Sequence, residues 1–263
     1  MIEQVSEIIF NEEVTKDCFL MGFKSANIAA EARPGQFVMI QVGPGTDPLL
    51  RRPFSICRCR EDGVFLILYK VVGRGTRLMS RVKKGDRLSV IGPLGNGFIL
   101  PEDPIKPLLV SGGMGIAPLL FLCQALETDD TIFMAGYRLA SEIIDIRKIG
   151  LPHLKILTAT EDGLIGHHGL VTELLEAGLH ESDEERLQVF ACGPVPMLRQ
   201  VADITLRAID LECQVSLESP MACGVGACQG CAIKASSEEN RTFFSVCRDG
   251  PVFDARTLDW KSL

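Results

Sequence analysis

Four cysteines toward the end of the chain constrain its fold more than any other feature of the sequence. Three lie in the stretch ACGVGACQGC and the last in FFSVCRDG, at positions Cys223, Cys228, Cys231 and Cys247. The spacing C-x4-C-x2-C, followed by a distant fourth cysteine, is typical of a plant-type 2Fe–2S cluster. Thiolates are the soft ligands that such clusters need. The pattern therefore predicts a loop that wraps around a pair of iron atoms.

The segment that carries these cysteines is rich in glycine and lacks the apolar periodicity of an independent core. We therefore expect the bound cluster to stabilise it. Gly224, Gly226 and Gly230 allow unusual backbone dihedrals, and their amides are placed to hydrogen-bond to sulfur. The alternative is a structural zinc site. Such sites favour two pairs of cysteines spaced by two residues, and only Cys228 and Cys231 form such a pair.

Composition excludes several classes of protein. The 263 residues carry a net charge of −7 with a pI near 5.2, which argues against nucleic acid as the main partner. No apolar run reaches the roughly 18 residues that span a bilayer, and the N-terminus does not resemble a signal peptide. We therefore expect a cytosolic protein. In that reducing compartment, ten cysteines indicate metal or redox roles rather than disulfides.

The chain divides into three regions by pattern. Residues 1–100 contain short strands between turns, at 36–42, 65–72 and 87–92, which is typical of a small antiparallel barrel. Residues 101–212 alternate buried strands with helices, which predicts a parallel sheet. Residues 213–263 form the cysteine-rich segment. The predicted fold class is an α+β multidomain protein with an N-terminal antiparallel β-barrel, a central parallel α/β nucleotide-binding domain and a small C-terminal iron–sulfur lobe.

A first flavin-binding signal is the run RRPFSI at 51–56, which we place at the end of a barrel strand. Arg52 is suited to pair with a pyrophosphate through charge-assisted hydrogen bonds. Pro53 stiffens the turn, and Phe54 and Ser55 are placed to lie along an isoalloxazine ring.

A second signal is YKVVGRGTRLMS at 69–80, where we expect a strand to end at Val72. Gly73 and Gly75 open the backbone, and Thr76 is a candidate N-cap of a short helix running to Ser80. A helix N-terminus with free amides favours anions. A third glycine turn, GPLGNGF at 92–98, follows nearby. Each segment alone is equally consistent with an ordinary turn, and the three in this order favour a flavin site.

Two glycine-rich turns follow buried strands in the central region. One is VSGGMGIAP at 110–118, with Gly112, Gly113 and Gly115; it is not the GxGxxG fingerprint. The other is ACGPVPML at 191–198, with Cys192, Gly193 and Pro194. Both lie at the strand ends where open α/β sheets bind ligands. Cys192 is either placed for a nicotinamide or is a small buried hydrophobic residue.

Taken together, RPFS, GGMGIAP and CGP resemble the motifs of the ferredoxin–NADP reductase superfamily. The segment SLESPMACGVGACQGC…FFSVCRDGPVFDA narrows the resemblance to the electron-transfer subunits of type B, NAD-dependent dihydroorotate dehydrogenases. The resemblance covers essentially the whole chain. It implies an FAD-binding barrel over 1–100, an NAD-binding domain over 101–212 and a 2Fe–2S lobe over 213–263.

The resemblance also implies a role for the chain and its site residues. It implies transfer of electrons from an FMN-containing dihydroorotate dehydrogenase catalytic subunit, in a heterotetramer of two of each chain, to NAD in pyrimidine biosynthesis. It implies no catalytic residue on this chain and no dihydroorotate site. The implied FAD-binding residues are Arg52, Pro53, Phe54, Ser55, Tyr69, Lys70, Val71, Gly75 and Thr76. The implied NAD-binding residues are Gly112, Gly113, Gly115, Cys192, Gly193 and Pro194, and the cluster ligands are Cys223, Cys228, Cys231 and Cys247.

Two related groups share this architecture and remain the alternative: small subunits of NAD(P)H–ferredoxin oxidoreductases and hydrogenase-associated reductase subunits. The former typically carry aspartate at the position of Cys223. Gln229 departs from the family pattern, where an aromatic residue is frequent. The choice between NAD and NADP is open from the residues, because Arg138 suits a 2′-phosphate whereas Glu142 would repel it.

We predict that the purified protein contains about one FAD and two irons per chain, with acid-labile sulfide. Metal analysis, sulfide determination and the visible spectrum check this expectation. Stoichiometric zinc without sulfide and without absorbance beyond the near ultraviolet would contradict the cluster assignment.

Overall fold

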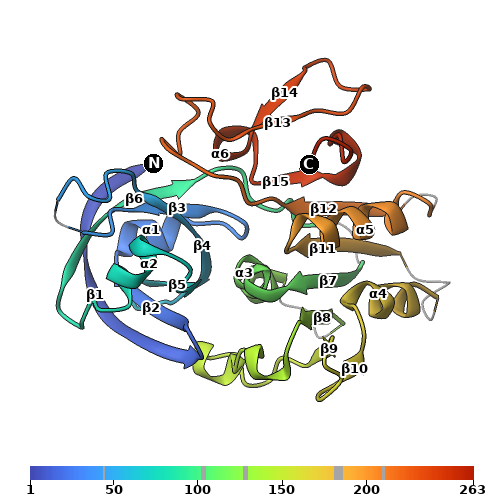
Figure 1. Ribbon diagram of the computed structural model, residues 1–263, viewed down its shortest axis with the longest axis horizontal. Coiled ribbons are helices and arrows are strands. Elements are labelled where there is room, and N and C mark those ends of the chain that lie inside the picture. Colours follow the sequence, from blue (N-terminus) through green and yellow to red (C-terminus); the bar gives the residue numbers. More distant parts are fainter. Residues whose placement is uncertain (44, 102–104, 127–129, 181–185, 209–210) are drawn as a thin grey trace.

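The computed structural model describes residues 1–263 except 44, 102–104, 127–129, 181–185 and 209–210. Within these residues the chain forms a closed six-stranded barrel, a seven-stranded sheet flanked by helices, and a C-terminal lobe with a two-stranded sheet. Figure 1 shows the barrel on one side, the large sheet on the other and the lobe across their top. The predicted fold class is confirmed.

The barrel contains six antiparallel strands in the spatial order β1-β2-β5-β4-β3-β6. Their bounds are β1 Ile2–Thr15, β2 Cys18–Lys24, β3 Phe37–Ile40, β4 Arg52–Cys59, β5 Val64–Lys70 and β6 Arg87–Leu94. Two short helices accompany them, α1 Ala26–Glu31 and α2 Arg74–Met79. The strands predicted at 36–42, 65–72 and 87–92 correspond to β3, β5 and β6. The predicted end at Val72 is wrong by two residues, because β5 ends at Lys70.

The large sheet has the order β10-β9-β8-β7-β11-β12-β15. Its bounds are β7 Lys106–Gly112, β8 Ile132–Tyr137, β9 Ile156–Thr160, β10 His167–His168, β11 Leu187–Cys192, β12 Glu212–Ser216 and β15 Val252–Asp254. All neighbours are parallel except β12 and β15. The sheet thus includes strands from both sides of residue 213, and the predicted domain limits stay a prediction.

Helices cover both faces of this sheet (Figure 1). They are α3 Ile116–Leu126, α4 Val171–His180 and α5 Val195–Thr205, with short 3-10 turns η1 Gly113–Gly115, η2 Ala140–Glu142 and η3 Ile146–Ile149. The helix after the second glycine-rich turn, α5, ends at Thr205. Helix α3 is apolar around most of its circumference, because it packs between the sheet and barrel strand β4.

The C-terminal lobe is small, and most of its buried apolar residues belong to the same cluster as those of the large sheet. Its elements are β13 Ala232–Lys234, β14 Phe243–Ser245, α6 Val246–Asp249 and η4 Ala255–Thr257. Phe244 packs against Phe253 with ring centroids 5.2 Å apart, which joins the lobe to edge strand β15. Trp260 donates from Nε1 to the carbonyl of Ala255 at 2.8 Å. The lobe therefore depends on the sheet for its packing.

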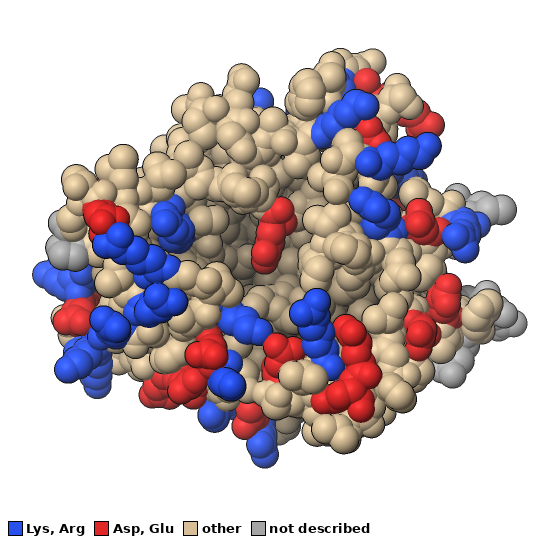
Figure 2. All heavy atoms as spheres, viewed as in Figure 1, with Lys and Arg blue, Asp and Glu red and all other residues tan. Residues whose placement is uncertain are grey.

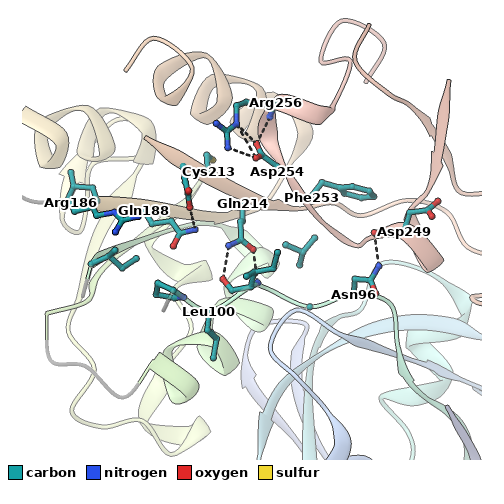
Figure 3. A pocket seen from close by; sticks show the side chains of 17 residues that line it. Asn96, Leu100, Arg186, Gln188, Cys213, Gln214, Asp249, Phe253, Asp254 and Arg256 are labelled. Carbon is teal, nitrogen blue, oxygen red and sulfur yellow. Dashed lines mark hydrogen bonds and ion pairs between the residues drawn. The ribbon is translucent and has the colours of Figure 1, made fainter. Parts of the chain in front are cut away.

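Polar contacts fix the barrel against the large sheet. Gln124 of α3 donates to the carbonyl of Cys59 at 2.8 Å and accepts from its amide. Arg58 donates to the carbonyl of Ile149 at 2.6 Å. Gln214 of β12 both accepts from the amide of Ile99 and donates to its carbonyl (Figure 3). The Gln214 contacts hold the linker after the barrel against the sheet. Among the described residues, we find no helix with the length and apolarity of a membrane span.

We predict that Leu120→Ala lowers the free energy of unfolding by about 2–5 kcal/mol. Leu120 is fully buried in the cluster that joins α3 to the barrel and the sheet, so truncation leaves a cavity. Denaturant unfolding of the cofactor-free chain measures the effect. Leu164→Ala is the matched control: its side chain is 77% exposed, and we expect a change within about 0.5 kcal/mol. Equal losses would contradict the assigned core.

Candidate functional site

The four predicted cluster ligands come together in the C-terminal lobe. Cys231 and Cys247 have their sulfurs 3.3 Å apart. The amide of Gly226 donates to the sulfur of Cys247 at 3.1 Å, and the amides of Val225 and Cys228 donate to Cys223 at 3.4 Å. Backbone amides thus already point at the sulfurs. This arrangement stabilises thiolates and fits a cluster whose sulfurs accept hydrogen bonds.

Two of these thiols have different acidities before iron binds. Partial burial raises the pKa of Cys223, but the amides of Val225 and Cys228 outweigh it and lower the pKa to about 6. Burial and a hydrogen bond with Cys231 raise the pKa of Cys247 to about 12. Cys223 is therefore largely a thiolate at neutral pH, whereas Cys247 releases its proton when metal binds.

The loop backbone shows why glycine occurs where it does. Gly224 and Gly226 have φ of 72° and 80°, as expected for the left-handed region. Gly230 does not, and its neighbour Gln229 takes φ of 57° instead. Within the described ranges, no three His, Cys, Asp or Glu side chains converge on one point suited to a single metal ion. The preference for a cluster over a zinc site at these cysteines therefore rests on their spacing in the sequence.

A cavity of about 630 Å³ opens where the barrel, the large sheet and the C-terminal lobe meet. Figure 2 shows the same face with a hollow near its centre. The volume is in the range of small-molecule and cofactor sites. The predicted flavin residues that line it are Arg52, Pro53, Phe54, Ser55, Tyr69, Lys70, Gly75 and Thr76. Val71 is not among the lining residues; its amide donates to the carbonyl of Asp17, and Val72 lines the cavity instead.

Two expected local structures of this region are corrected. The RPFS run lies at the beginning of β4, since Arg52 is its first residue, not at the end of a strand. Thr76 is not the N-cap of α2. The N-cap is Gly73, and Thr76 lies in the first turn, where its hydroxyl accepts from the amides of Val72 and Gly73. The turn is thus closed from within the helix.

Cations and aromatic rings share the cavity wall. Arg52, Lys70 and Arg74 contribute positive charge, and Phe54 meets Tyr69 edge-on with centroids 5.8 Å apart. A Cβ on Gly75 would lie 3.2 Å from Nε of Arg52, so glycine lets α2 approach that guanidinium. A wall with both features suits a ligand that joins a flat ring to a pyrophosphate. The residues present therefore fit FAD.

Lys70 and Glu142 join the barrel to the nucleotide half. Nζ of Lys70 lies 2.8 Å from Oε1 of Glu142, and this hydrogen bond lowers the pKa of the Glu142 carboxyl. Glu142 is thus paired within the chain, and its effect on a 2′-phosphate stays a prediction. Arg138 is exposed at the end of β8.

Sequence reasoning missed one side of the cavity. Residues 216–221, which follow β12, line it together with Met114 and Ala117 at the start of α3. Glu218 faces the open cavity, yet the surrounding walls desolvate its carboxyl and raise the pKa. The signal was present as SLESP directly after a buried strand, at the edge where α/β sheets bind ligands.

The two predicted nucleotide turns lie side by side at the carboxyl ends of β7 and β11, where Ser111 is paired with Cys192. A Cβ on Gly115 would lie 2.1 Å from the carbonyl oxygen of Cys192, and one on Gly112 would lie 2.7 Å from Pro194. Glycine therefore lets these turns touch. Gly113 has φ of 52° and open space around it. Gly193 belongs to the same contact: a Cβ added there would lie 2.9 Å from the amide nitrogen of Gly112.

Cys192 is fully buried at the end of β11, and burial strongly raises the pKa of its thiol. It is paired in register with Ser216 of β12, which lines the cavity. The thiol therefore stays protonated one strand away from the cavity. Both readings of Cys192 agree with this position, so its role at a nicotinamide stays a prediction.

A larger cavity of about 760 Å³ lies elsewhere (Figure 3). It is lined by the first residues of β11 and β12 and by the linker after the barrel, including Leu187, Glu212 and Ile99. Ligands of open α/β sheets bind at the opposite, carboxyl edge of the strands. This cavity therefore does not compete with the smaller one as the flavin site.

The cluster loop and the flavin cavity lie on the same barrel strand. A Cβ on Gly224 would lie 2.5 Å from Cγ of Met39, so the loop backbone rests directly on that side chain. Met39 is paired with Pro53 of β4, and Phe37, two residues earlier on β3, lines the cavity. A single strand thus separates the two sites.

Comparison with known proteins agrees with this geometry. Residues 218–259 match the family model of the iron–sulfur cluster binding domain of dihydroorotate dehydrogenase B. The chain is 38% identical over 252 residues to the electron transfer subunit of NAD⁺-dependent dihydroorotate dehydrogenase B from Desulforamulus reducens, covering 94% of this chain and 95% of the relative. The corresponding subunit of Caldanaerobacter subterraneus is 38% identical over 253 residues, covering 96% and 97%.

The chain belongs to the family of dihydroorotate dehydrogenase B electron-transfer subunits. A solved NADH-dependent reduced ferredoxin–NADP oxidoreductase has a TM-score of 0.84 and 30% identity to this family member, covering 99% of this chain and 91% of that one. Phthalate dioxygenase reductase has a TM-score of 0.64 at 16% identity, covering 93% of this chain and 94% of its own, which shows a shared fold.

We predict that Cys223→Ser makes the cluster labile or shifts its spectrum while FAD stays bound, because the flavin cavity is lined by other residues. Visible absorbance and electron paramagnetic resonance (EPR) of the reduced protein measure the cluster, and flavin released on denaturation measures FAD. Cys123→Ser is the control, since Cys123 lies in α3, which packs against the barrel. Equal loss of the cluster in both variants would contradict the division of the cysteines.

Proposed function

We propose that this chain holds one FAD and one 2Fe–2S cluster and passes electrons from a partner FMN dihydroorotate dehydrogenase, through cluster and FAD, to NAD⁺ in pyrimidine biosynthesis. Membership of the electron-transfer subunit family supports the role. The observation that carries the proposal is the shared strand β3, with the cluster loop resting on Met39 and the flavin cavity beginning at Phe37. Neither group can lie far from the other.

The proposed FAD site is the 630 Å³ cavity. Arg52 binds the pyrophosphate, with Gly75 and Thr76 of α2 beside it. The flat ring lies along β4 and the end of β5, against Phe54 and Tyr69. Tyr69 donates its hydroxyl to Asn11 at 3.0 Å, so it offers its ring face rather than its oxygen. When bound, FAD exchanges a hydride with the nicotinamide and electrons singly with the cluster.

The proposed NAD site lies at the adjoining turns after β7 and β11. Gly112, Gly113 and Gly115 give the dinucleotide access to the backbone, and Gly193 and Pro194 continue the same surface. Glu218 lines the flavin cavity, and Cys192 is buried one strand away from it; these two residues are our candidates for the nicotinamide side. The preference for NAD rests on the family, because Glu142 is engaged with Lys70.

The proposed partner is an FMN-containing catalytic subunit, in a heterotetramer of two of each chain. Cys228 is exposed at the cluster loop, and Val225 beside it is 41% exposed. Phe243, at the start of β14 in the same lobe, is 60% exposed. These residues offer an apolar surface around the cluster for the partner. A reducing cytosol suits the thiolates that hold the iron.

A second candidate function is the small subunit of an NAD(P)H–ferredoxin oxidoreductase. The similarity to the solved NADH-dependent reduced ferredoxin–NADP oxidoreductase, with a TM-score of 0.84, supports this candidate. The fully thiolate ligand set with Cys223 and the match of residues 218–259 to the dihydroorotate dehydrogenase model favour the first proposal. The two differ in the partner rather than in the cofactors.

We predict that the isolated chain reduces artificial acceptors with NADH but does not oxidise dihydroorotate. The cavity that contains Glu218 is the proposed FAD site, so we assign the oxidation of dihydroorotate to the partner. Mixing the chain with a dihydroorotate-oxidising flavin subunit is expected to produce NAD-dependent orotate formation. Assays of each chain alone and of the mixture measure this. Oxidation of dihydroorotate by this chain alone, or complex formation only with a ferredoxin-type partner, would overturn the proposal.

A further inference from the structure

The GNG turn at 95–97 serves the cluster lobe rather than the flavin, contrary to the expectation from sequence. A Cβ on Gly95 would lie 2.6 Å from Cδ of Pro251 and 2.7 Å from the carbonyl oxygen of Gly250. A Cβ on Gly97 would lie 2.2 Å from the carbonyl oxygen of Pro34. Both glycines thus permit close approach, and between them they bring Asn96 of the barrel against the lobe.

Asn96 binds three successive carbonyl groups of the lobe. Its side-chain Nδ2 donates to the carbonyl of Arg248 at 3.1 Å and to that of Asp249 at 3.0 Å, and its backbone amide donates to that of Gly250 at 2.6 Å. Figure 3 shows Asn96 pointing from the end of the barrel toward Asp249. All three acceptors directly follow the cluster ligand Cys247.

These carbonyls need an external donor. Helix α6 is a single turn, Val246–Asp249, so its last carbonyl groups have no partner within the helix. The turn is held at its other end by Asp249, whose carboxylate accepts from the amide of Ser245 at 2.6 Å. After it the chain enters β15, which is paired with β12. Asn96 therefore holds residues 248–250, the short segment that connects the fourth ligand to the sheet.

We propose that Asn96 is a positioning residue for the iron–sulfur cluster: from the barrel, it fixes the α6 turn and thereby the sulfur of Cys247. The inference rests on the proposed function, since it assumes a cluster at the four cysteines. It makes the flavin-binding barrel, and not the lobe alone, responsible for the geometry of the fourth ligand. Hydrogen bonding and exposure around the ligands set cluster stability and potential.

Asn96→Asp tests this proposal, because aspartate has the same shape but cannot donate when ionised. We expect the cluster to be lost about three- to tenfold faster to a ferrous chelator, because two side-chain hydrogen bonds are replaced by repulsion between the carboxylate and the two carbonyl oxygens. We also expect the EPR signature and reduction potential of the cluster to shift. Asn96→Ala, which removes the donors without adding charge, should show a smaller change in the same direction.

Asn240→Asp is the matched control. Asn240 is exposed in the same lobe, between β13 and β14, and beside Arg241, which pairs with Asp249; this variant therefore adds the same charge near α6 without removing the hydrogen bonds of Asn96. FAD content and thermal unfolding of the flavin-bound protein report on folding in every variant. Equal cluster loss and an unchanged potential in Asn96→Asp and Asn240→Asp would overturn the role of Asn96. Absence of iron and sulfide from the unaltered protein would instead refute the proposed function.

Discussion

The close backbone contact between the cluster lobe and the barrel is the constraint on which the rest of the structure depends. The lobe shares its core with the large sheet, and glycine at positions 95 and 224 allows close contact between the lobe and barrel residues. A side chain at position 224 would push the cluster loop away from Met39 of strand β3, and one at position 95 would push away Gly250 and Pro251. Because β3 also borders the flavin cavity, the same contact fixes the cluster relative to the flavin. The electron-transfer function thus follows from packing rather than from a catalytic side chain.

Charge is distributed in keeping with this role. The chain is acidic overall, with a net charge of −7, yet Arg52, Lys70 and Arg74 line one cavity. Lys70 and Arg74 lie in ion pairs with Glu142 and Asp47, so Arg52 is the cation best placed to attract an anionic cofactor there. At the cluster loop, backbone amides rather than cationic side chains stabilise the thiolates. Lys70 of the barrel and Glu142, which follows β8 of the large sheet, form an ion pair where the two regions meet.

The sequence predicted elements whose signal is local. The cysteine spacing, the buried strands β7, β8, β9 and β11 and their glycine turns were all recognisable, because each is a short pattern with a known physical cause. Strands β1 and β2 were missed, since β1 alternates charged and apolar residues without a strong turn signal. Glu218 and Asn96 were missed for another reason: their roles depend on contacts between segments far apart in the chain. A glycine turn such as GNG indicates that another segment packs closely against its backbone, but the sequence does not show which segment that is.

Anaerobic titration of the isolated chain with NADH tests the central claim most directly, namely that one chain connects NAD to the cluster through a neighbouring flavin. Flavin absorbance and the EPR signal of the reduced cluster are followed in the same samples. The account predicts that flavin bleaching is accompanied by a cluster signal that approaches one spin per chain. A flavin fully reduced by NADH beside a cluster that stays oxidised, although dithionite reduces it, would contradict the account.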